Sequence, residues 1–318
     1  MPHHTHPVVD VHAHFVTPWY AAEAIAAGHV FPDGMPGWPS WTPEDHLRLM
    51  DAHGIDRAVL SISSPGVHFG DDAAAAALAR RVNDFAAETC AKWPDRFRFF
   101  AALPLPAVDA ALDEIAHGLD ELGAAGVAVE TNAHGHYLSD PMFEPVLAEL
   151  DRRAACVFVH PTSPPGWEQT ALGAPRPMLE FLADSTRTAA ALLLAGTPTR
   201  YSSLQLIITH CGAFLPLLAD RLKLFAAAIG TGGDTATIED GLNRLWYDLA
   251  GTPMPRHAES LIAMAGTGHL LYGSDYCWTP APAVAAQVAS LDEDWRRDLH
   301  GPWRDIVAAN TAVLLRSE

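Results

Sequence analysis

Five residues with metal-binding or acid–base side chains stand at the ends of apolar, strand-like segments. The segments are VVDVHAH, CVFVHP, LQLIITH and HLLYGSD, and the residues are His12, His14, His160, His210 and Asp275. Imidazole nitrogens and carboxylate oxygens bind divalent ions, and they also transfer protons near neutral pH. The carboxyl ends of parallel strands in a barrel meet on one face, where barrel enzymes have their active sites. The pattern therefore predicts a metal-dependent site.

His12 and His14 are two residues apart, so on one strand their side chains point to the same side and reach the same ion. An HxH pair alone is weak evidence in a chain with 17 histidines. The full set is stronger, because its members follow four different predicted strands. A closed metal site that only stabilises a non-catalytic binding protein is a further hypothesis, but it leaves the fifth candidate, His210, without a role.

Eight apolar segments rich in β-branched or aromatic residues alternate with segments of helical period. The predicted strands are residues 8–14, 57–63, 97–104, 126–132, 156–162, 204–212, 245–251 and 269–275. The predicted helices are residues 42–54, 71–92, 108–122, 141–152, 177–194, 214–229, 255–265 and 281–289. This alternation predicts an α/β fold, a (β/α)8 TIM barrel of about 250 residues plus loops. A doubly wound open sheet is the alternative, but it would need a glycine-rich turn after its first strand, where this chain has HAHFVTP.

Two long insertions, residues 16–41 and residues 161–176, follow predicted strands that carry metal ligands. Both are rich in proline, and both would overhang the carboxyl face of the barrel. We expect residues 16–41 to form a lid. Trp38 and Trp41 in this insertion, and Trp167 in the other, are candidates to stack on a substrate ring. Core packing of these rings, or loops that serve only their own stability, are the alternatives.

Composition limits the partners of this protein. The chain has 38 acidic and 20 basic residues and a net charge of −18, which would repel a nucleic acid or an anionic membrane surface. The start, MPHHTHPVVDV, lacks the features of a signal peptide, and no apolar run reaches the roughly 20 residues that span a bilayer. We therefore expect a soluble, cytoplasmic protein. Because no linker divides the chain, residues 1–318 are predicted to form one domain.

The segments DVHAH, VHPT, ITHCG and GSDY, in this order on strands one, five, six and eight, resemble the amidohydrolase superfamily over nearly the whole chain. The resemblance implies a divalent ion held by the first-strand pair His12 and His14, the fifth-strand His160 and the eighth-strand Asp275. For the sixth-strand His210 it implies either a second ion or a part in the chemistry.

Two-metal members of the superfamily bridge their ions with a carboxylated lysine, occasionally a glutamate, at the end of strand four. This chain has only two lysines, Lys92 and Lys223, and both fall in predicted helices, so a lysine bridge is excluded. Glu130 stands near the required place, and a bridging role for it is the alternative to an orienting or pocket role. We therefore predict one ion, Zn or Mn, held by the four ligands above, with His210 free to act as acid or base.

The longer phrases HPTSPP, LEFLADSTRTAAALLLAGT, ITHCGAFLPLLADRL and YGSDY, with the late Asn310, are similar to one subfamily. It includes aminocarboxymuconate semialdehyde decarboxylase and the 6-methylsalicylate and other hydroxybenzoate decarboxylases. The aminocarboxymuconate enzymes hold a substrate carboxylate with an arginine after strand one, yet no Arg or Lys lies between Phe15 and Leu47 here. This departure argues against a dicarboxylate substrate. Arg221 matches a second arginine that reaches a neighbouring subunit's site, so the resemblance implies a homodimer; a surface ion pair is the alternative for Arg221.

The function that this resemblance implies is that of a carboxy-lyase. We predict metal-dependent, non-oxidative decarboxylation of a small aromatic or unsaturated carboxylic acid, such as the ortho-hydroxybenzoate 6-methylsalicylate. The ion would bind the carboxylate and its neighbouring hydroxyl, and His210 or Asp275 would supply the proton that replaces CO2. Hydrolysis of a lactone or amide is the alternative, with an ion-activated water and Asp275 as the group that takes its proton. The ligand set alone does not separate the two reactions.

Overall fold

Eight parallel strands form the centre of the computed structural model, which describes residues 6–230 and 235–315. They are β1 Val9–His14, β2 Arg57–Ser61, β3 Phe97–Ala102, β4 Gly126–Glu130, β7 Cys156–His160, β8 Gln205–Ile208, β9 Trp246–Asp248 and β10 Leu270–Leu271. Neighbours pair in the order β1-β2-β3-β4-β7-β8-β9-β10. The ring closes where the Val11 N–H donates to the Tyr272 carbonyl oxygen at 2.9 Å. The predicted (β/α)8 barrel is confirmed, because an open sheet would not pair its first strand with its last.

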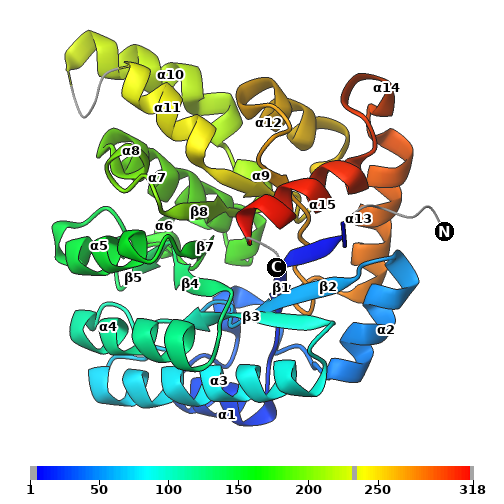
Figure 1. Cartoon of the computed structure of the whole chain (residues 1–318). Helices are drawn as coiled ribbons and strands as arrows, with labels where there is room; N and C mark the ends of the chain where they lie inside the picture. The colour runs from blue at the N-terminus through cyan, green and yellow to red at the C-terminus, as the bar shows by residue number, and fades with distance from the viewer. Residues whose placement is uncertain (1–5, 231–234, 316–318) are drawn as a thin grey trace.

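Helices surround this ring of strands (Figure 1). Their bounds are α1 Pro18–Ala26, α2 Pro43–His53, α3 Asp72–Lys92, α4 Val108–Ala116, α5 Glu144–Arg152, α6 Trp167–Thr170, α7 Glu180–Leu194, α8 Thr197–Arg200, α9 Thr209–Gly212, α10 Leu215–Ile229, α11 Thr235–Arg244, α12 Ala258–Ala265, α13 Ala281–Asp294, α14 Arg297–His300 and α15 Trp303–Leu314. Short 3₁₀ or π-helical turns are η1 Pro32–Gly34, η2 His117–Glu121, η3 Pro141–Phe143, η4 Arg176–Met178 and η5 Pro253–His257. Strands β5 Asn132–Ala133 and β6 His136–Tyr137 form a separate antiparallel pair. None of the helices in the described ranges is long and apolar enough to cross a membrane.

Local sequence signals set the ends of α2, as expected. The Thr42 hydroxyl accepts a hydrogen bond from the Asp45 N–H at 3.1 Å, which satisfies a donor that the first turn leaves free. Gly54 ends the helix in a left-handed conformation with a φ of 65°, which glycine adopts without steric cost. Both residues act through contacts within their own turn, so the sequence reveals them.

Other helix boundaries depend on tertiary packing. The helix expected over residues 177–194 begins only at Glu180, because the chain up to Met178 forms the turn η4. Helices α11 and α15 have no counterpart among the predicted helices. In α11 the glycine at 241 weakens the helical signal, yet a Cβ there would lie 2.6 Å from Leu193. Close packing of α11 on α7 therefore requires a glycine at position 241, although glycine weakens the helical pattern in the sequence.

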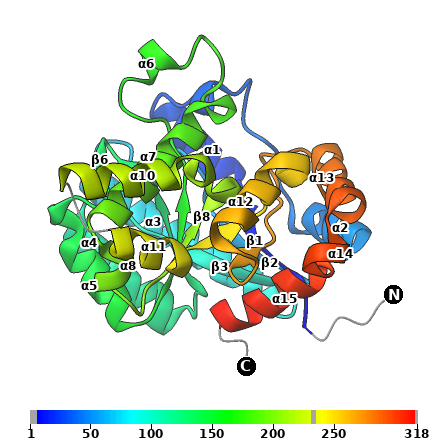
Figure 2. The same cartoon turned by 90° about the horizontal axis from the view of Figure 1, so that it is seen from above.

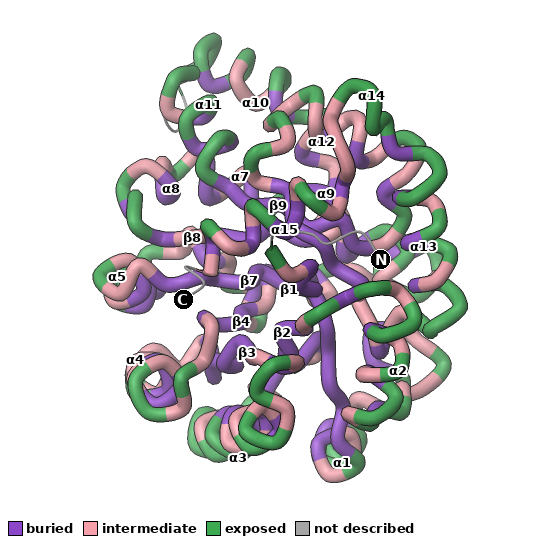
Figure 3. The backbone as a smooth tube through the Cα atoms, turned by 45° about the vertical axis from the view of Figure 1, so that its right-hand side comes forward, coloured by how far each residue is buried: buried purple, intermediate pink, exposed green. Residues whose placement is uncertain are grey.

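Two layers of apolar residues hold the barrel together. One cluster fills the interior and includes Val11, Phe100 and Phe158. The rings of Phe100 and Phe158 stack with their centroids 5.5 Å apart. A larger cluster lies between the strands and the helices. Figure 3 shows the strands buried and the outer sides of the helices exposed. The ring of Phe158 also contacts His12 edge-on at 4.9 Å, so the interior cluster forms an apolar floor for the histidines.

The two long insertions contact each other. Residues 16–41 contain α1 and η1, and residues 161–176 contain α6. The Ser163 hydroxyl donates to the Asp33 carboxylate, and Arg176 Nε donates to the Ser163 hydroxyl at 3.0 Å. Figure 2 shows α6 projecting beyond the ring of helices, beside the insertion that follows β1. The role of residues 16–41 as a lid remains a prediction.

Candidate metal centre and active site

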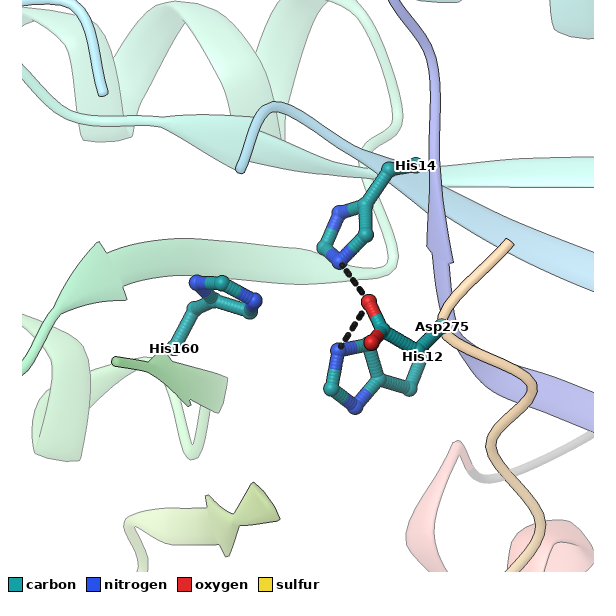
Figure 4. Close-up of side chains that lie close together, drawn as sticks. All are labelled: His12, His14, His160 and Asp275. Atoms are coloured by element: carbon teal, nitrogen blue, oxygen red, sulfur yellow. Dashed lines mark ion pairs between the residues drawn. The ribbon is translucent and has the colours of Figure 1, made fainter. Parts of the chain in front are cut away.

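Four of the predicted residues converge at the carboxyl end of the barrel (Figure 4). His12 and His14 come from β1, His160 ends β7, and Asp275 lies in the loop after β10. One potential ligand atom from each lies within 4.8 Å of the others. Asp275 Oδ1 is 3.5 Å from His12 Nε2 and 3.3 Å from His14 Nε2. Three imidazoles and a carboxylate are a donor set that suits Zn or Mn.

A bulge in β1 places both histidines inside the barrel. Val11 belongs to the interior cluster, whereas Ala13 belongs to the outer cluster. The register between β1 and β2 shifts in this stretch, so the side of β1 that faces the interior changes. His12 and His14 therefore follow Val11 on the interior side, which a regular alternation would not allow.

Asp248, the last residue of β9, orients His12. Its Oδ2 lies 2.8 Å from His12 Nδ1, and both side chains are fully buried. Burial lowers the pKa of His12, but the Asp248 and Asp275 carboxylates outweigh this effect and raise that pKa to about 10. The two carboxylates thus create a negative potential that favours a cation. Because His12 donates its Nδ1–H to Asp248, its Nε2 faces Asp275 and can bind an ion once it releases its own proton.

The other ligands have the protonation states that metal binding requires. Burial lowers the pKa of His14 and holds the pKa of His160 well below the usual range, so both rings stay neutral near pH 7. Burial alone would raise the pKa of Asp275. The nearby imidazoles of His12, His14 and His210 reverse that effect and hold the Asp275 pKa well below its usual value. His14 and His160 therefore offer neutral imidazoles, Asp275 offers an ionised carboxylate, and His12 would release its extra proton when an ion binds.

Buried nitrogen atoms without a partner indicate what the group binds. His12 Nε2, His14 Nε2 and His160 Nδ1 are buried, and none has a hydrogen-bond partner in the described part of the chain. A buried polar atom without a partner costs about 1–3 kcal/mol. Ligation of one ion would satisfy all three atoms, while His14 Nδ1 is held separately by Ser61 Oγ at 3.0 Å. The residues present therefore fit a divalent metal ion.

His210 lies beside this group in a left-handed backbone conformation. Its φ is 54°, which is uncommon for a residue other than glycine, and its N–H donates to Asp248 Oδ1 at 2.9 Å. Its Nε2 is 3.8 Å from Asp275 Oδ2, and its ring centroid is 5.0 Å from that of His12. Asp248 thus holds both a predicted ligand and the predicted acid–base residue.

Glu130, the alternative bridging ligand, ends β4 and pairs in register with His160. Its Oε2 is 3.5 Å from His160 Nδ1. Burial, and to a lesser degree the charge of Asp33, raises the pKa of Glu130 well above its usual value, which favours a protonated carboxyl group. Glu130 lies next to the group of four potential ligands and is not one of them.

A cleft of about 640 Å³ leads to the group, and His160, His210 and Asp275 line its inner end. Among its described lining residues, Asp33 and Asp275 are the carboxylates, and none is an arginine or lysine. A cation that partners the carboxylate of a ligand must therefore come from outside the side chains of this cleft. The predicted ion fits that need, and a second carboxylate on the ligand would have no positive partner here.

The predicted aromatic residues have different surroundings. Trp38 packs on Trp278 at 5.5 Å between ring centroids, and Trp41 is buried, with its Nε1–H donated to His46. Neither is among the described residues that line the cleft, whereas Trp278 is. Trp167 lines a second cavity of about 420 Å³. Stacking of the three predicted rings on a substrate thus remains a prediction, and Trp278 is the tryptophan among the described residues that line the cleft.

Arg221 lies on an exposed part of α10, and its guanidinium packs over the Phe225 ring at 4.8 Å. It is not among the described residues that line the cleft. The neighbouring Leu217 and Leu224 are 75% and 63% exposed. Arg221 therefore lies on an exposed, apolar face of α10, and contact of this face with water is unfavourable.

A family model described as amidohydrolase matches residues 9–301. The chain belongs to the amidohydrolase family. The 6-methylsalicylic acid decarboxylase acuB of Aspergillus aculeatus is 34% identical over 301 residues, which cover 90% of this chain and 89% of that protein. A crystal structure of an amidohydrolase II is 32% identical with a TM-score of 0.90, and covers 98% of this chain and 100% of its own. A Polaromonas dihydroxybenzoic acid decarboxylase, solved with manganese and 2-nitroresorcinol, has a TM-score of 0.84 at 24% identity, covers 98% of this chain and 97% of its own, and shares the fold.

These matches confirm the predicted membership in the decarboxylase branch of the amidohydrolases, and thus a carboxy-lyase. Asp248 and Trp278 are not among the residues predicted from the sequence. Asp248 carries the same signal as the predicted residues, because it is a carboxylate at the carboxyl end of an apolar strand, in LWYDLAG. Trp278 lies in a loop, and no local pattern distinguishes it from the other tryptophans.

Proposed function

We propose that this amidohydrolase decarboxylates a small ortho-hydroxybenzoate with one carboxylate, such as 6-methylsalicylate, with one divalent ion per chain. One observation carries the proposal: a cleft with no arginine or lysine among its described lining residues ends on a cluster of three histidines and an ionised carboxylate, with His210 beside it. The similarity to a 6-methylsalicylic acid decarboxylase over most of the chain supports the substrate class.

His12, His14, His160 and Asp275 would hold the ion, which we propose to be Zn or Mn. Bound there, it would act as a Lewis acid that neutralises the substrate carboxylate and orients the neighbouring hydroxyl. Asp248 contributes by fixing the tautomer of His12, and Ser61 by fixing the ring of His14. The Phe158 floor keeps the inner end of the site apolar, which strengthens electrostatic interactions there.

His210 and Asp275 are the residues that we propose to move the proton. Decarboxylation breaks the bond between the ring carbon and the carboxyl carbon, and the ring carbon gains one proton in place of CO2. His210 lies at the inner end of the cleft, and its Nε2 is within 3.8 Å of Asp275 Oδ2. A protonated imidazole can deliver its proton to carbon near neutral pH. Asp275 would stabilise the protonated form of His210 until the proton is transferred to the ring carbon.

We also propose that two copies form a homodimer through the apolar face of α10. Leu217, Leu224 and Ile229 on this helix are each more than 60% exposed. Arg221 lies among them and would serve the partner's site. In mixtures of the inactive variants Arg221→Ala and His210→Asn, subunit exchange should restore activity, because one site of the mixed dimer has both residues intact. No recovery after verified exchange would refute the shared site.

The reaction class is tested by running the reaction in D2O. With 6-methylsalicylate, the protein should release CO2 and 3-methylphenol with one deuterium at the former carboxyl position, seen by NMR or mass spectrometry. A hydrolase would instead add the elements of water to its product. Cleavage of a lactone or amide, with no CO2 from any aromatic acid, would replace this proposal with a hydrolase.

A further inference from the structure

The cleft that leads to the metal centre is larger and more apolar than a methyl-substituted hydroxybenzoate requires. Cavities of about 300–1,000 Å³ hold drug-sized ligands, and this cleft has about 640 Å³. The groups proposed to act on the substrate occupy only its inner end. The remaining walls come from the segment after η1, the turns η4 and η5, α7, the loop after β10 and α13, and their apolar members include Met35, Met178, Phe181, Met254, Ala283 and Ala286.

Burial gives the cleft a direction. His160 is 3% exposed and Phe181 is 7% exposed, and their rings contact each other edge-on at 6.1 Å. Met178, in the same wall, is 76% exposed. The wall therefore runs from the metal centre to the surface and stays apolar along its length. Large apolar side chains at an exposed rim are the usual mark of a binding groove.

The chemistry of the walls indicates a flexible, apolar occupant. Three of the lining residues are methionines, Met35, Met178 and Met254, whose unbranched, polarisable side chains adapt to ligands of varied shape. Small residues on α13, Ala283 and Ala286, leave room along the outer part of the cleft. The cleft offers no arginine or lysine for an acidic tail among its described lining residues.

We infer that the substrate is a hydroxybenzoate with an apolar chain longer than methyl, which lies along this wall from Phe181 to Met178. This inference rests on the proposed function for the ring and its carboxylate, and adds a binding site for the chain. Each methylene group that leaves water gains about 0.8 kcal/mol when fully buried, and part of that in an open cleft. We therefore expect affinity to increase roughly two- to fourfold per methylene.

The test measures binding and turnover separately. Loss of CO2 from a 4- or 6-alkylsalicylate gives the same 3-alkylphenol, so 3-methylphenol and 3-pentylphenol are probes for both attachment points. Calorimetry on the metal-loaded protein should show 3-pentylphenol binding at least about tenfold more tightly. Turnover should follow, with kcat/KM for 6-pentylsalicylate at least about tenfold above that for 6-methylsalicylate.

Matched variants locate the chain. Met178→Glu places a charge in the outer wall and should bring the pentyl-to-methyl affinity ratio close to one. Leu172→Glu makes the same change at a residue that is 85% exposed, precedes η4 and does not line the cleft, so it should leave the ratio unchanged. Equal affinity for the two phenols in the unmodified protein, or an unchanged ratio in Met178→Glu, would overturn the inference. If the phenols bind as expected but no acid releases CO2, the proposed function fails and the chain site stands.

Discussion

Replacement of Asp248 by asparagine is the most informative perturbation of this site, because one buried carboxylate holds two predicted functional residues. Asp248 Oδ2 accepts from His12 Nδ1 at 2.8 Å, and Oδ1 accepts from the N–H groups of His210 and Ala250, each at 2.9 Å. An asparagine has one acceptor oxygen and one donor NH2 group, so it cannot accept on both sides.

Both orientations of the new amide are unfavourable. If its oxygen faces the backbone N–H groups, its NH2 group faces His12 Nδ1, which must then accept and move its proton to Nε2. That proton occupies the lone pair needed for the ion. If the amide is flipped, its NH2 group opposes two backbone donors, and the left-handed turn at His210 loses the hydrogen bond that holds it. Loss of such an orienting partner typically costs 10- to 100-fold in metal affinity, or about 1.4–2.7 kcal/mol.

The measurement is the dissociation constant for Zn and for Mn, determined by competition with a chelating dye, together with the metal-induced rise in Tm. Asp248→Asn should weaken binding at least about tenfold and reduce the Tm rise. Asp240→Asn, which makes the same charge change at a half-exposed carboxylate paired with Arg244, is the matched control and should bind like the unmodified protein. Metal affinity within about twofold of the control would refute the role of Asp248 in orienting His12.

Three further predictions follow from the same geometry. His160→Ala should lose the ion and activity together. Metal analysis should find one ion per chain both in the unmodified protein and in Glu130→Ala. Two ions in the unmodified protein, reduced to one in Glu130→Ala, would indicate a glutamate-bridged pair. His210→Asn should keep the ion but lose about 10²- to 10⁴-fold in turnover, and loss of the ion would make it a ligand. Burial lowers the pKa of His46 to about 3. Below about pH 6.5, His46 therefore binds a proton in the unfolded chain but not in the folded chain. The free energy of unfolding should therefore fall by about 1.4 kcal/mol for each unit that the pH drops from about 6.5 toward 3. Urea unfolding of His46→Asn, which keeps an acceptor for Trp41, should not show this decrease.

Most of the predicted site could be derived from short segments because strand order and ligand order are linked. An apolar run of strand length that ends in a histidine or aspartate has its functional side chain at the carboxyl face of a parallel barrel, whatever the details of packing. His12, His14, His160 and Asp275 follow this rule, and the structure brings their ligand atoms together. The fold class and the membership in the amidohydrolases rest on the same local patterns.

Other features depend on contacts between residues far apart in the sequence. Asp248 and His12 are separated by 236 positions, and only the closed ring brings the end of β9 close to β1, with β10 between the two strands. The bulge in β1 arises from its pairing with β2, and it changes which side of the strand faces inward after Val11. A strand alone carries no record of its partner's register.

The sequence by itself determined the kind of site, because ligand types, strand ends and their order along the chain are local properties. Tertiary structure decided which aromatic ring lines the cleft. Trp38, Trp41 and Trp278 are equivalent in sequence terms. Trp41 is buried and donates a hydrogen bond to His46, whereas Trp278, in the loop after β10, lines the cleft. The direction in which a loop side chain points depends on packing over the whole molecule, and so does the shape of the cleft that selects the substrate.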